Sequence, residues 1–458
     1  MTIDETPSRP PYRDRIAMLP GDPPVAYRPG VIIVDDAARI DLGAEGTPIF
    51  VTSDPGQSEA VPPIGQRYLV EVANPAAAVA DLRSRGQNAE LDIVYFASGD
   101  CDCCGCPPHP AMAAELAADG WGANPWRANP WRANPWRANP WRANPWRANP
   151  WRAHASELNI VATGRPPTSS VMPAPSRELP PRPPNPQNHV KIGVLDSGLA
   201  GGKTNADQMR PKFLGSDKTA LQRISGDGDV PSEQIGKYPA DAYLDPVAGH
   251  GTFIAGIIEQ LTPGCTISIR KVFHPEGDVS VSTLAPELWL LMLTAKPDIV
   301  NLSFGGTGRS PMLELVIDHY HGQHGVVFVG AAGNEGSCVE QYPAALPTVI
   351  GVAALGPDGP APFSNYGSWV DACAPGTDIV SSFFAEFNGA MPPINGVDSD
   401  DFKDWATWSG TSFAAPVVVA ALAREMLVGQ CKAAEAVERL VRAPHLARLP
   451  FMGTVVNY

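Results

Sequence analysis

The chain has 458 residues, of which 44% are hydrophobic and 18% charged, so it can bury a large core and wholesale disorder is excluded. The formal net charge of −14 argues against a nucleic-acid partner, because such a partner requires a basic face. The longest apolar runs, residues 284–295, 326–332 and 413–423, are shorter than the roughly 20 residues that span a membrane, so no transmembrane segment is predicted.

Residues 1–30 are rich in proline and mixed in charge, which predicts a disordered arm. No apolar segment follows the acidic first residues, so no secretory signal is predicted and we expect a cytoplasmic protein, unless another export route acts on it. Of the eight cysteines, four are scattered: Cys265, Cys338, Cys373 and Cys431. These are expected to be small buried residues, as in a reducing compartment.

Residues 31–97 predict a small α+β module. Apolar runs at 31–34, 67–72 and 91–96 are typical of strands, and residues 75–85 have helical periodicity. Asn74 is placed to cap this helix and Gly86 to end it.

A cysteine cluster opens the next segment, residues 98–188. Four thiols and an imidazole could bind Zn²⁺; they belong to Cys101, Cys103, Cys104, Cys106 and His109. Their spacing is tighter than the usual ligand pairs and no second half-site follows. Redox-labile thiols or a modified peptide segment are equally open interpretations.

A perfect repeat follows, in which Ala-Asn-Pro-Trp-Arg occurs six times between Ala123 and Arg152. A period of five fits neither helix nor strand, and the proline in every unit forbids a regular helix. Three interpretations remain open: a linker lengthened by repeat expansion, an arm that binds a partner through Trp and Arg, or a peptide substrate carried in cis. Residues 164–188 are crowded with proline and predict a stiff linker.

Residues 189–445 alternate strands and helices and predict an α/β domain with a doubly wound, mostly parallel sheet; residues 446–458 are expected to form a tail. The expected strands are 191–195, 266–272, 298–303 and 326–332, and the expected helices are 282–295 and 311–324. Asp196 ends the first strand at the carboxyl edge of the sheet, where doubly wound folds place their sites.

Two further polar residues lie at helix starts. His250 stands between two glycines, just before an apolar helical run, and Ser412 lies in the tight N-terminal turn of a second buried helix. Alone, Ser412 or His250 could be a helix cap and Asp196 a turn residue. Together, the segments around them closely resemble the subtilisin-like serine proteases, in the same chain order of Asp, His and Ser. The resemblance covers residues 188–445, and the chain is identified as a member of that family.

The resemblance implies a serine endopeptidase with a peptide or protein substrate and no required cofactor. Ser412 would be the nucleophile, His250 the base and Asp196 the residue that orients it. Asn334 and the Ser412 amide would bind the oxyanion. The implied substrate-binding residues are Ser303, Phe304 and Gly305, whose edge pairs with an extended substrate, and Ala331, Ala332 and Gly333.

Several alternatives stay open at this point. The module at 31–97 occupies the position of an inhibitory propeptide in relatives, or is a generic accessory domain. Clustered acids in the loop 383–407 could hold a structural Ca²⁺ or could simply be solvated; they are Asp398, Asp400, Asp401 and Asp404. A dedicated processing protease that acts on its own repeats or a cognate peptide, and a non-catalytic peptide-binding protein, are the rival functions.

Overall fold

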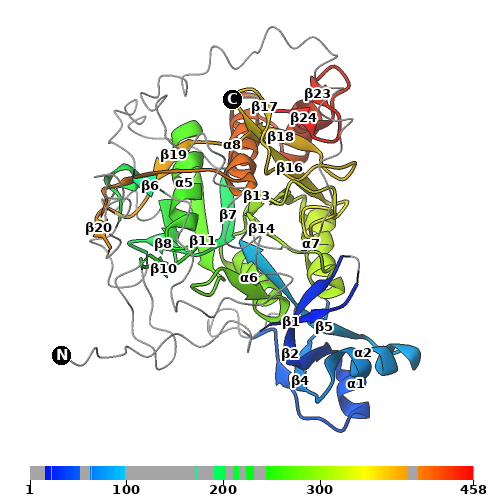
Figure 1. Cartoon of the computed structure of the whole chain (residues 1–458). Coiled ribbons are helices and arrows are strands. Elements are labelled where there is room, and N and C mark those ends of the chain that lie inside the picture. Colours follow the sequence, from blue (N-terminus) through cyan, green and yellow to red (C-terminus); the bar gives the residue numbers. More distant parts are fainter. Residues whose placement is uncertain are drawn as a thin grey trace, which may run out of the picture.

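A mostly parallel sheet forms the centre of the computed structural model (Figure 1), which describes residues 16–21, 23–51, 62, 64–97, 172–173, 190–202, 210–215, 223–231, 244–389 and 401–456. Across the sheet the strands run β23 (Arg448–Leu449), β24 (Gly453–Val455), β18 (Ala372–Pro375), β16 (Val349–Gly356), β15 (Val327–Ala331), β13 (Ile299–Leu302), β7 (Lys191–Asp196), β11 (Thr266–Lys271) and β9 (Ile224–Gly226). All neighbours from β24 to β9 are parallel, which confirms the predicted α/β class.

Helices cover both faces of this sheet. On one face pack α5 (His250–Leu261), α8 (Thr411–Val428) and the short α9 (Ala433–Val437), and on the other α6 (Val281–Thr294) and α7 (Pro311–His324). The strands alternate accordingly: Ile192 and Val194 belong to the core under α5 and α8, and Leu195 to the opposite core. Burial on both faces explains why these strands are continuous apolar runs in the sequence.

Strand β7 lies where the direction of winding changes. From β7 the chain passes through α5 to β11 on one side, and then through α6 to β13 on the other side. The carboxyl end of such a strand opens a crevice between two connections that leave in opposite directions. Asp196, the last residue of β7, therefore lies at the position in the sheet that most favours a binding site.

A second sheet holds the N-terminal module and joins it to the main domain. It contains β1 (Ala17–Leu19), β2 (Val25–Val34), β3 (Thr47–Pro48), β4 (Tyr68–Glu71) and β5 (Ala89–Ala97), with α1 (Asp36–Asp41) and α2 (Pro75–Ser84) packed on it. Asn74 caps α2 by accepting from the backbone of Ala77. Strand β5 continues past the module and pairs with β12 (Asp278–Ser280) and β14 (Phe304–Gly305).

Two predicted boundaries are wrong in the described residues. Within the arm expected over residues 1–30, the chain forms β1 and the first half of β2. A strand can form there because Pro29 lies at an irregularity in register between Tyr27 and Ile32. The tail expected over 446–458 belongs to the main sheet, since β24 pairs with β18 and buries Leu449 and Met452 beneath it.

Other expectations meet the structure only in part. Within 98–188 the structure describes β6 (Met172–Pro173), which pairs with β22 (Trp405–Trp408); the cysteine cluster and the repeats lie outside the described residues. The four scattered cysteines are not joined in disulfides; Cys265 and Cys373 are buried and Cys431 is half-buried, but Cys338 is exposed, against expectation.

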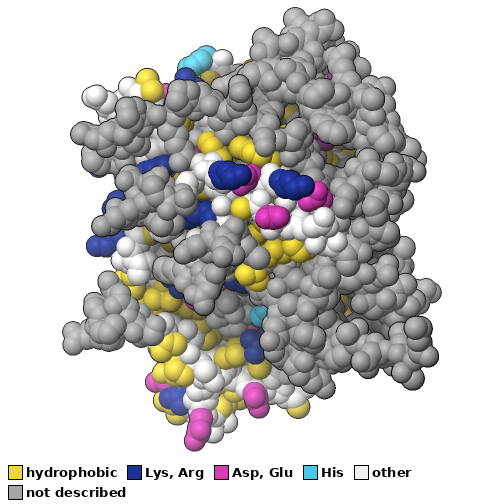
Figure 2. All heavy atoms as spheres, turned by 90° about the vertical axis from the view of Figure 1, so that its left-hand side faces the viewer, with side chains coloured by type: hydrophobic (Ala, Val, Ile, Leu, Met, Phe, Trp, Pro, Cys, Tyr) yellow, Lys and Arg dark blue, Asp and Glu magenta, His cyan; other side chains and the backbone are white. Residues whose placement is uncertain are grey.

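Helix α8 alone, among the described helices, is long and apolar enough to cross a membrane. Its most apolar window is 72% buried inside the fold, as expected for a core helix packed between β-strands and α5. On the face shown in Figure 2, the described surface carries acidic and basic side chains close together, with hydrophobic ones between them.

Candidate active site

Asp196 and His250 form a buried hydrogen-bonded pair. The His250 Nδ1 lies 2.8 Å from Asp196 Oδ1; His250 is 4% exposed and Asp196 is 0% exposed. His250 is the first residue of α5, after Gly249 with a φ of +79°. A Cβ on Gly251 would lie 2.3 Å from the carbonyl oxygen of Gly198, so glycine is needed there for the helix to start against β7. A carboxylate on Nδ1 fixes the ring so that Nε2 faces away from it.

Ser412 lies in the first turn of α8, tied to the end of β13. Its hydroxyl donates to the carbonyl of Ser303 at 3.3 Å, and the Ser303 hydroxyl donates to the carbonyl of Ser412 at 2.9 Å. The Asn301 amide donates to the same Ser303 hydroxyl at 2.8 Å. These bonds fix the position of Ser412 relative to the predicted substrate edge.

Aromatic side chains bring the starts of α5 and α8 together. The ring of Phe413, next to Ser412, lies 5.2 Å from the His250 ring, and the Trp408 ring stands edge-on to it at 5.3 Å. Offset and edge-on arrangements at these separations are favourable. The imidazole and the serine turn therefore share one aromatic cluster.

Asn334 is held by the residue before Ser412. Its Oδ1 accepts from the backbone N–H of Thr411 at 2.8 Å and from the Thr411 hydroxyl at 2.9 Å, and that hydroxyl accepts from the Gly333 N–H at 3.0 Å. Because the carbonyl oxygen binds Thr411, the amide nitrogen of Asn334 is presented on the opposite side of the group. That orientation suits a donor to a developing negative charge.

The predicted substrate edge is already paired within the chain. Phe304 lies opposite Ala97 and Gly305 opposite Phe96, while β12 pairs with the other side of β5. Strand β5 is thus the middle strand of three antiparallel strands. The edge that the sequence predicts for an extended peptide holds a segment of this protein.

Tyr95 anchors β5 in this position. Its side chain is 1% exposed, its ring lies 6.2 Å from that of Phe304, and its hydroxyl donates to the Gly308 carbonyl at 2.9 Å. A Cβ on Gly306 would lie 3.0 Å from the Tyr95 ring, so Gly306 leaves room for it. A buried aromatic ring with a satisfied hydroxyl is a strong docking contact.

Two carboxylates of β5 cap helices of the main domain. Glu90 accepts from the Ser310 hydroxyl at 2.9 Å and the Met312 N–H at 3.1 Å, at the start of α7. Asp92 accepts from the N–H and hydroxyl of Ser282, at 2.9 and 2.7 Å, at the start of α6. Helix N-termini favour such carboxylates. Burial raises the pKa of Glu90 to about 7 and also raises the pKa of Asp92.

The remaining predicted site residues differ in their surroundings. Ala331 and Ala332 are fully buried, at the end of β15 and just after it, and Gly333 follows with a φ of +101°. Their contact with a substrate stays a prediction, as does that of Phe304, whose side chain is buried.

The predicted metal ligands are only partly described. Asp401 pairs with Lys403 at 2.7 Å, and Asp404 accepts from the Lys212 N–H at 2.9 Å. Asp398, Asp400 and the proposed zinc ligands lie outside the described residues. In the part of the chain that the structure describes, no three acidic, cysteine or histidine side chains gather as a metal site.

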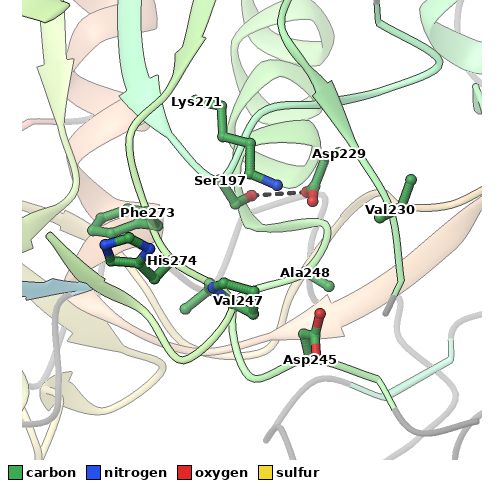
Figure 3. Close-up of a pocket in the computed structure, with 10 residues that line it drawn as sticks. Ser197, Asp229, Val230, Asp245, Val247, Ala248, Lys271, Phe273 and His274 are labelled. Carbon is green, nitrogen blue, oxygen red and sulfur yellow. Dashed lines mark hydrogen bonds between the residues drawn. The ribbon is translucent and has the colours of Figure 1, made fainter. Parts of the chain in front are cut away.

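Sequence reasoning missed Asp229, which bonds the residues next to Asp196 and His250. Its Oδ2 accepts from the Ser197 hydroxyl at 2.8 Å (Figure 3). The same oxygen accepts from the Gly249 N–H, also at 2.8 Å. The residue lies in the two-residue strand β10 (Gly228–Asp229), between segments with no recognisable periodicity. Neither its position nor its partners could be read from the local pattern.

Comparisons with known proteins match the part of the chain that contains Asp196, His250 and Ser412. The family model described as the subtilase family matches residues 187–440, more than half of the chain. Subtilisin amylosacchariticus of Bacillus subtilis subsp. amylosacchariticus is 30% identical over 244 residues, which are 48% of this chain and 58% of that protein. The thermophilic serine proteinase of Bacillus sp. strain AK1 is 34% identical over 180 residues, which are 37% of this chain and 40% of that protein.

Among solved structures, a cold adapted subtilisin-like serine proteinase is 23% identical, with a TM-score of 0.43, and the match covers 61% of this chain and 94% of that one. The match to each of the two Bacillus relatives named above spans less than two thirds of that relative's length. The family match covers Asp196, His250, Asn334 and Ser412 alike. The chain belongs to the subtilase family.

Proposed function

We propose that this protein is a serine endopeptidase, with Ser412 as nucleophile, His250 as general base and Asp196 as its orienting carboxylate. The observation that carries the proposal is the buried 2.8 Å bond between His250 Nδ1 and Asp196, at the switch point of the sheet and in one aromatic cluster with the serine turn. The family membership of residues 187–440 supports the same assignment.

The reaction proceeds in two halves. The Ser412 hydroxyl, released from the Ser303 carbonyl by rotation about its side-chain bond, attacks the scissile carbonyl carbon and passes its proton to His250 Nε2. The C–N bond then breaks, and His250 returns the proton to the leaving amine. Water, deprotonated by His250, hydrolyses the acyl-enzyme and restores Ser412. These side chains and water supply the whole reaction.

The oxyanion formed on attack needs donors fixed in advance. The Asn334 amide and the backbone N–H of Ser412 supply them, and Thr411 holds the amide in place through its two bonds to Oδ1. Since α8 begins at Thr411, the positive end of its dipole also favours the negative oxygen.

The N-terminal module acts as an intramolecular inhibitor. Strand β5 occupies the edge formed by β14 and β12, so a substrate strand must displace it. His250 and Ser412 are only 4% and 2% exposed, which accords with a closed resting state. Module residues 31–97 are therefore propeptide-like in this proposal.

Hydrolysis of an unfolded generic protein tests the central assignment. The full chain should release peptides, and Ser412→Ala should lose activity by a factor of about 10⁶, because a triad without its nucleophile retains only binding and oxyanion effects. Ser409→Ala is the matched control and should retain activity: this serine lies just before α8, and its hydroxyl accepts from the Asp378 N–H. Unchanged hydrolysis in Ser412→Ala contradicts the assignment.

A further inference from the structure

We infer that Asp229 is a positioning residue for the Asp196–His250 pair, a role that rests on the proposed function. Its side chain touches neither the expected nucleophile nor the substrate edge in the contacts described above. It holds instead the two backbone segments that carry the pair. Asp229 is 2% exposed, and burying a polar group costs free energy unless the group is hydrogen-bonded.

The first segment is the turn after Asp196. The Ser197 hydroxyl donates to Asp229 Oδ2 at 2.8 Å, and the Ser197 N–H donates to Asp196 Oδ1 at 2.8 Å. Asp196 Oδ1 is the same oxygen that bonds His250. Asp229 therefore fixes, through one serine, the N–H that orients the catalytic carboxylate.

The second segment is the start of α5. The Gly249 N–H, directly before His250, donates to Asp229 Oδ2 at 2.8 Å, and the Gly251 N–H, directly after it, donates to the Ser197 hydroxyl at 3.1 Å. His250 is thus held on both sides by one two-residue bridge. Strand pairing places Asp229 opposite Ala200, which anchors the bridge to the backbone that follows Asp196.

The surroundings of the Asp229 carboxyl group change its pKa. Burial raises the pKa of Asp229 to about 7, and the nearby Asp196 acts in the same direction, while Lys271 lowers it. Figure 3 shows the Lys271 side chain reaching toward the Ser197–Asp229 pair, with Asp245 and His274 farther along the same cavity. Because both bonds end on Oδ2, protonation at Oδ1 leaves both acceptor contacts intact.

Kinetics of full-length variants test the inference. Asp229→Ala should lower kcat by roughly 100-fold with KM nearly unchanged, since a small misplacement of catalytic groups costs about that much. Asp229→Asn should restore kcat to within about threefold, because its amide oxygen can accept both bonds. Asp298→Ala is the matched control: Asp298 accepts from the Lys191 N–H at the opposite end of β7, so its loss should reduce stability and leave kcat unchanged.

A second readout does not depend on turnover. The His250 Nδ1–H proton, hydrogen-bonded to Asp196, should give a far-downfield NMR signal in the wild type, in Asp229→Asn, in Asp298→Ala and in the inactive Ser412→Ala. The signal should broaden or disappear in Asp229→Ala. If the wild type keeps this signal but hydrolyses nothing, the proposed function fails while the positioning role stands.

The positioning role is overturned if Asp229→Ala keeps both its kcat and the NMR signal. It is also overturned if Asp229→Asn is as impaired as Asp229→Ala, since the acceptor geometry would then not matter. Should Asp229→Ala fail to fold, Ser197→Ala replaces it: the hydroxyl that joins Asp229 to the Asp196 turn is lost, and a smaller fall in kcat with the same NMR change is expected.

Discussion

The two polar atoms of the Asn334 side chain have different roles. The oxygen holds Thr411 through bonds of 2.8 and 2.9 Å, and the nitrogen is the proposed oxyanion donor. A residue with such divided contacts allows the chemical role to be separated from the structural one by an isosteric change.

Asn334→Asp keeps the oxygen toward Thr411 and removes the N–H donor. In subtilisin itself, loss of this kind of amide costs about 2.7–4 kcal/mol, so we expect kcat to fall by at least about 100-fold with little change in KM. Steady-state kinetics on a short peptide check this. Asn365→Asp is the comparison and should affect stability more than kcat; the amide oxygen of this buried residue accepts from the Glu335 and Ser337 N–H groups. Equal kcat values in Asn334→Asp and the wild type would remove Asn334 from the site.

The residues that sequence could predict share one property. Asp196, His250 and Ser412 lie at the ends of apolar elements, among glycines and small residues that the close packing of the site requires, so each signal is local. Asp229 carries no such signal, because its bonds to Ser197 and Gly249 join residues 32 and 20 positions away. Contacts of this kind follow from the tertiary fold alone.

At the scale of elements, the same limit applies to β5. The apolar run at residues 91–96 and the cap of α2 by Asn74 are local signals, and they predict a strand and a helix there. Its pairing with β12 and β14 spans some two hundred residues and depends on shape, on Tyr95 and on two buried carboxylates. The sequence predicts the strand and not what it covers.

The charge of Glu90 should make the docking of β5 depend on pH. Its pKa is about 7 in the docked state and ordinarily 4.5, so docking favours the protonated acid. Docking is therefore strongest below about pH 4.5. It weakens as the pH rises toward about 7, because over this range Glu90 is ionised in the undocked state and still protonated in the docked state. We expect hydrolysis after incubation at about pH 8 to exceed that after incubation at about pH 5.5, both assayed at one pH.

Glu90→Gln cannot ionise and should reduce this difference, because the glutamine keeps an acceptor for the start of α7. Glu314→Gln, at an acid on α7 that forms its ion pair with Arg309, is the matched control and should keep the wild-type difference. A difference of the same size in Glu90→Gln would show that another group controls docking.

At the scale of the whole molecule, the module and the domain share the site. Removing the Tyr95 side chain should loosen the module, since truncation of a buried aromatic residue costs about 3–5 kcal/mol. We expect Tyr95→Ala to hydrolyse a generic protein substrate faster than the wild type, at least 10-fold in the initial rate, because the substrate edge is freed more often.

Arg85→Ala is the control for this change. Arg85 is half-exposed and forms its ion pairs with Asp41 and Asp81 within the module, away from β14, so its loss should leave the initial rate unchanged. A slower rate in Tyr95→Ala, with the fold intact by circular dichroism, would mean that the module supports the active site and does not inhibit it.

Labelling by a fluorophosphonate probe, with the modified peptide identified by mass spectrometry, tests the central claim most directly. We expect one phosphonate on the peptide that contains Ser412 in the wild type, faster labelling in Tyr95→Ala, and none in Ser412→Ala or His250→Ala. Absence of label in both the wild type and Tyr95→Ala, or label that persists in Ser412→Ala, would contradict the account.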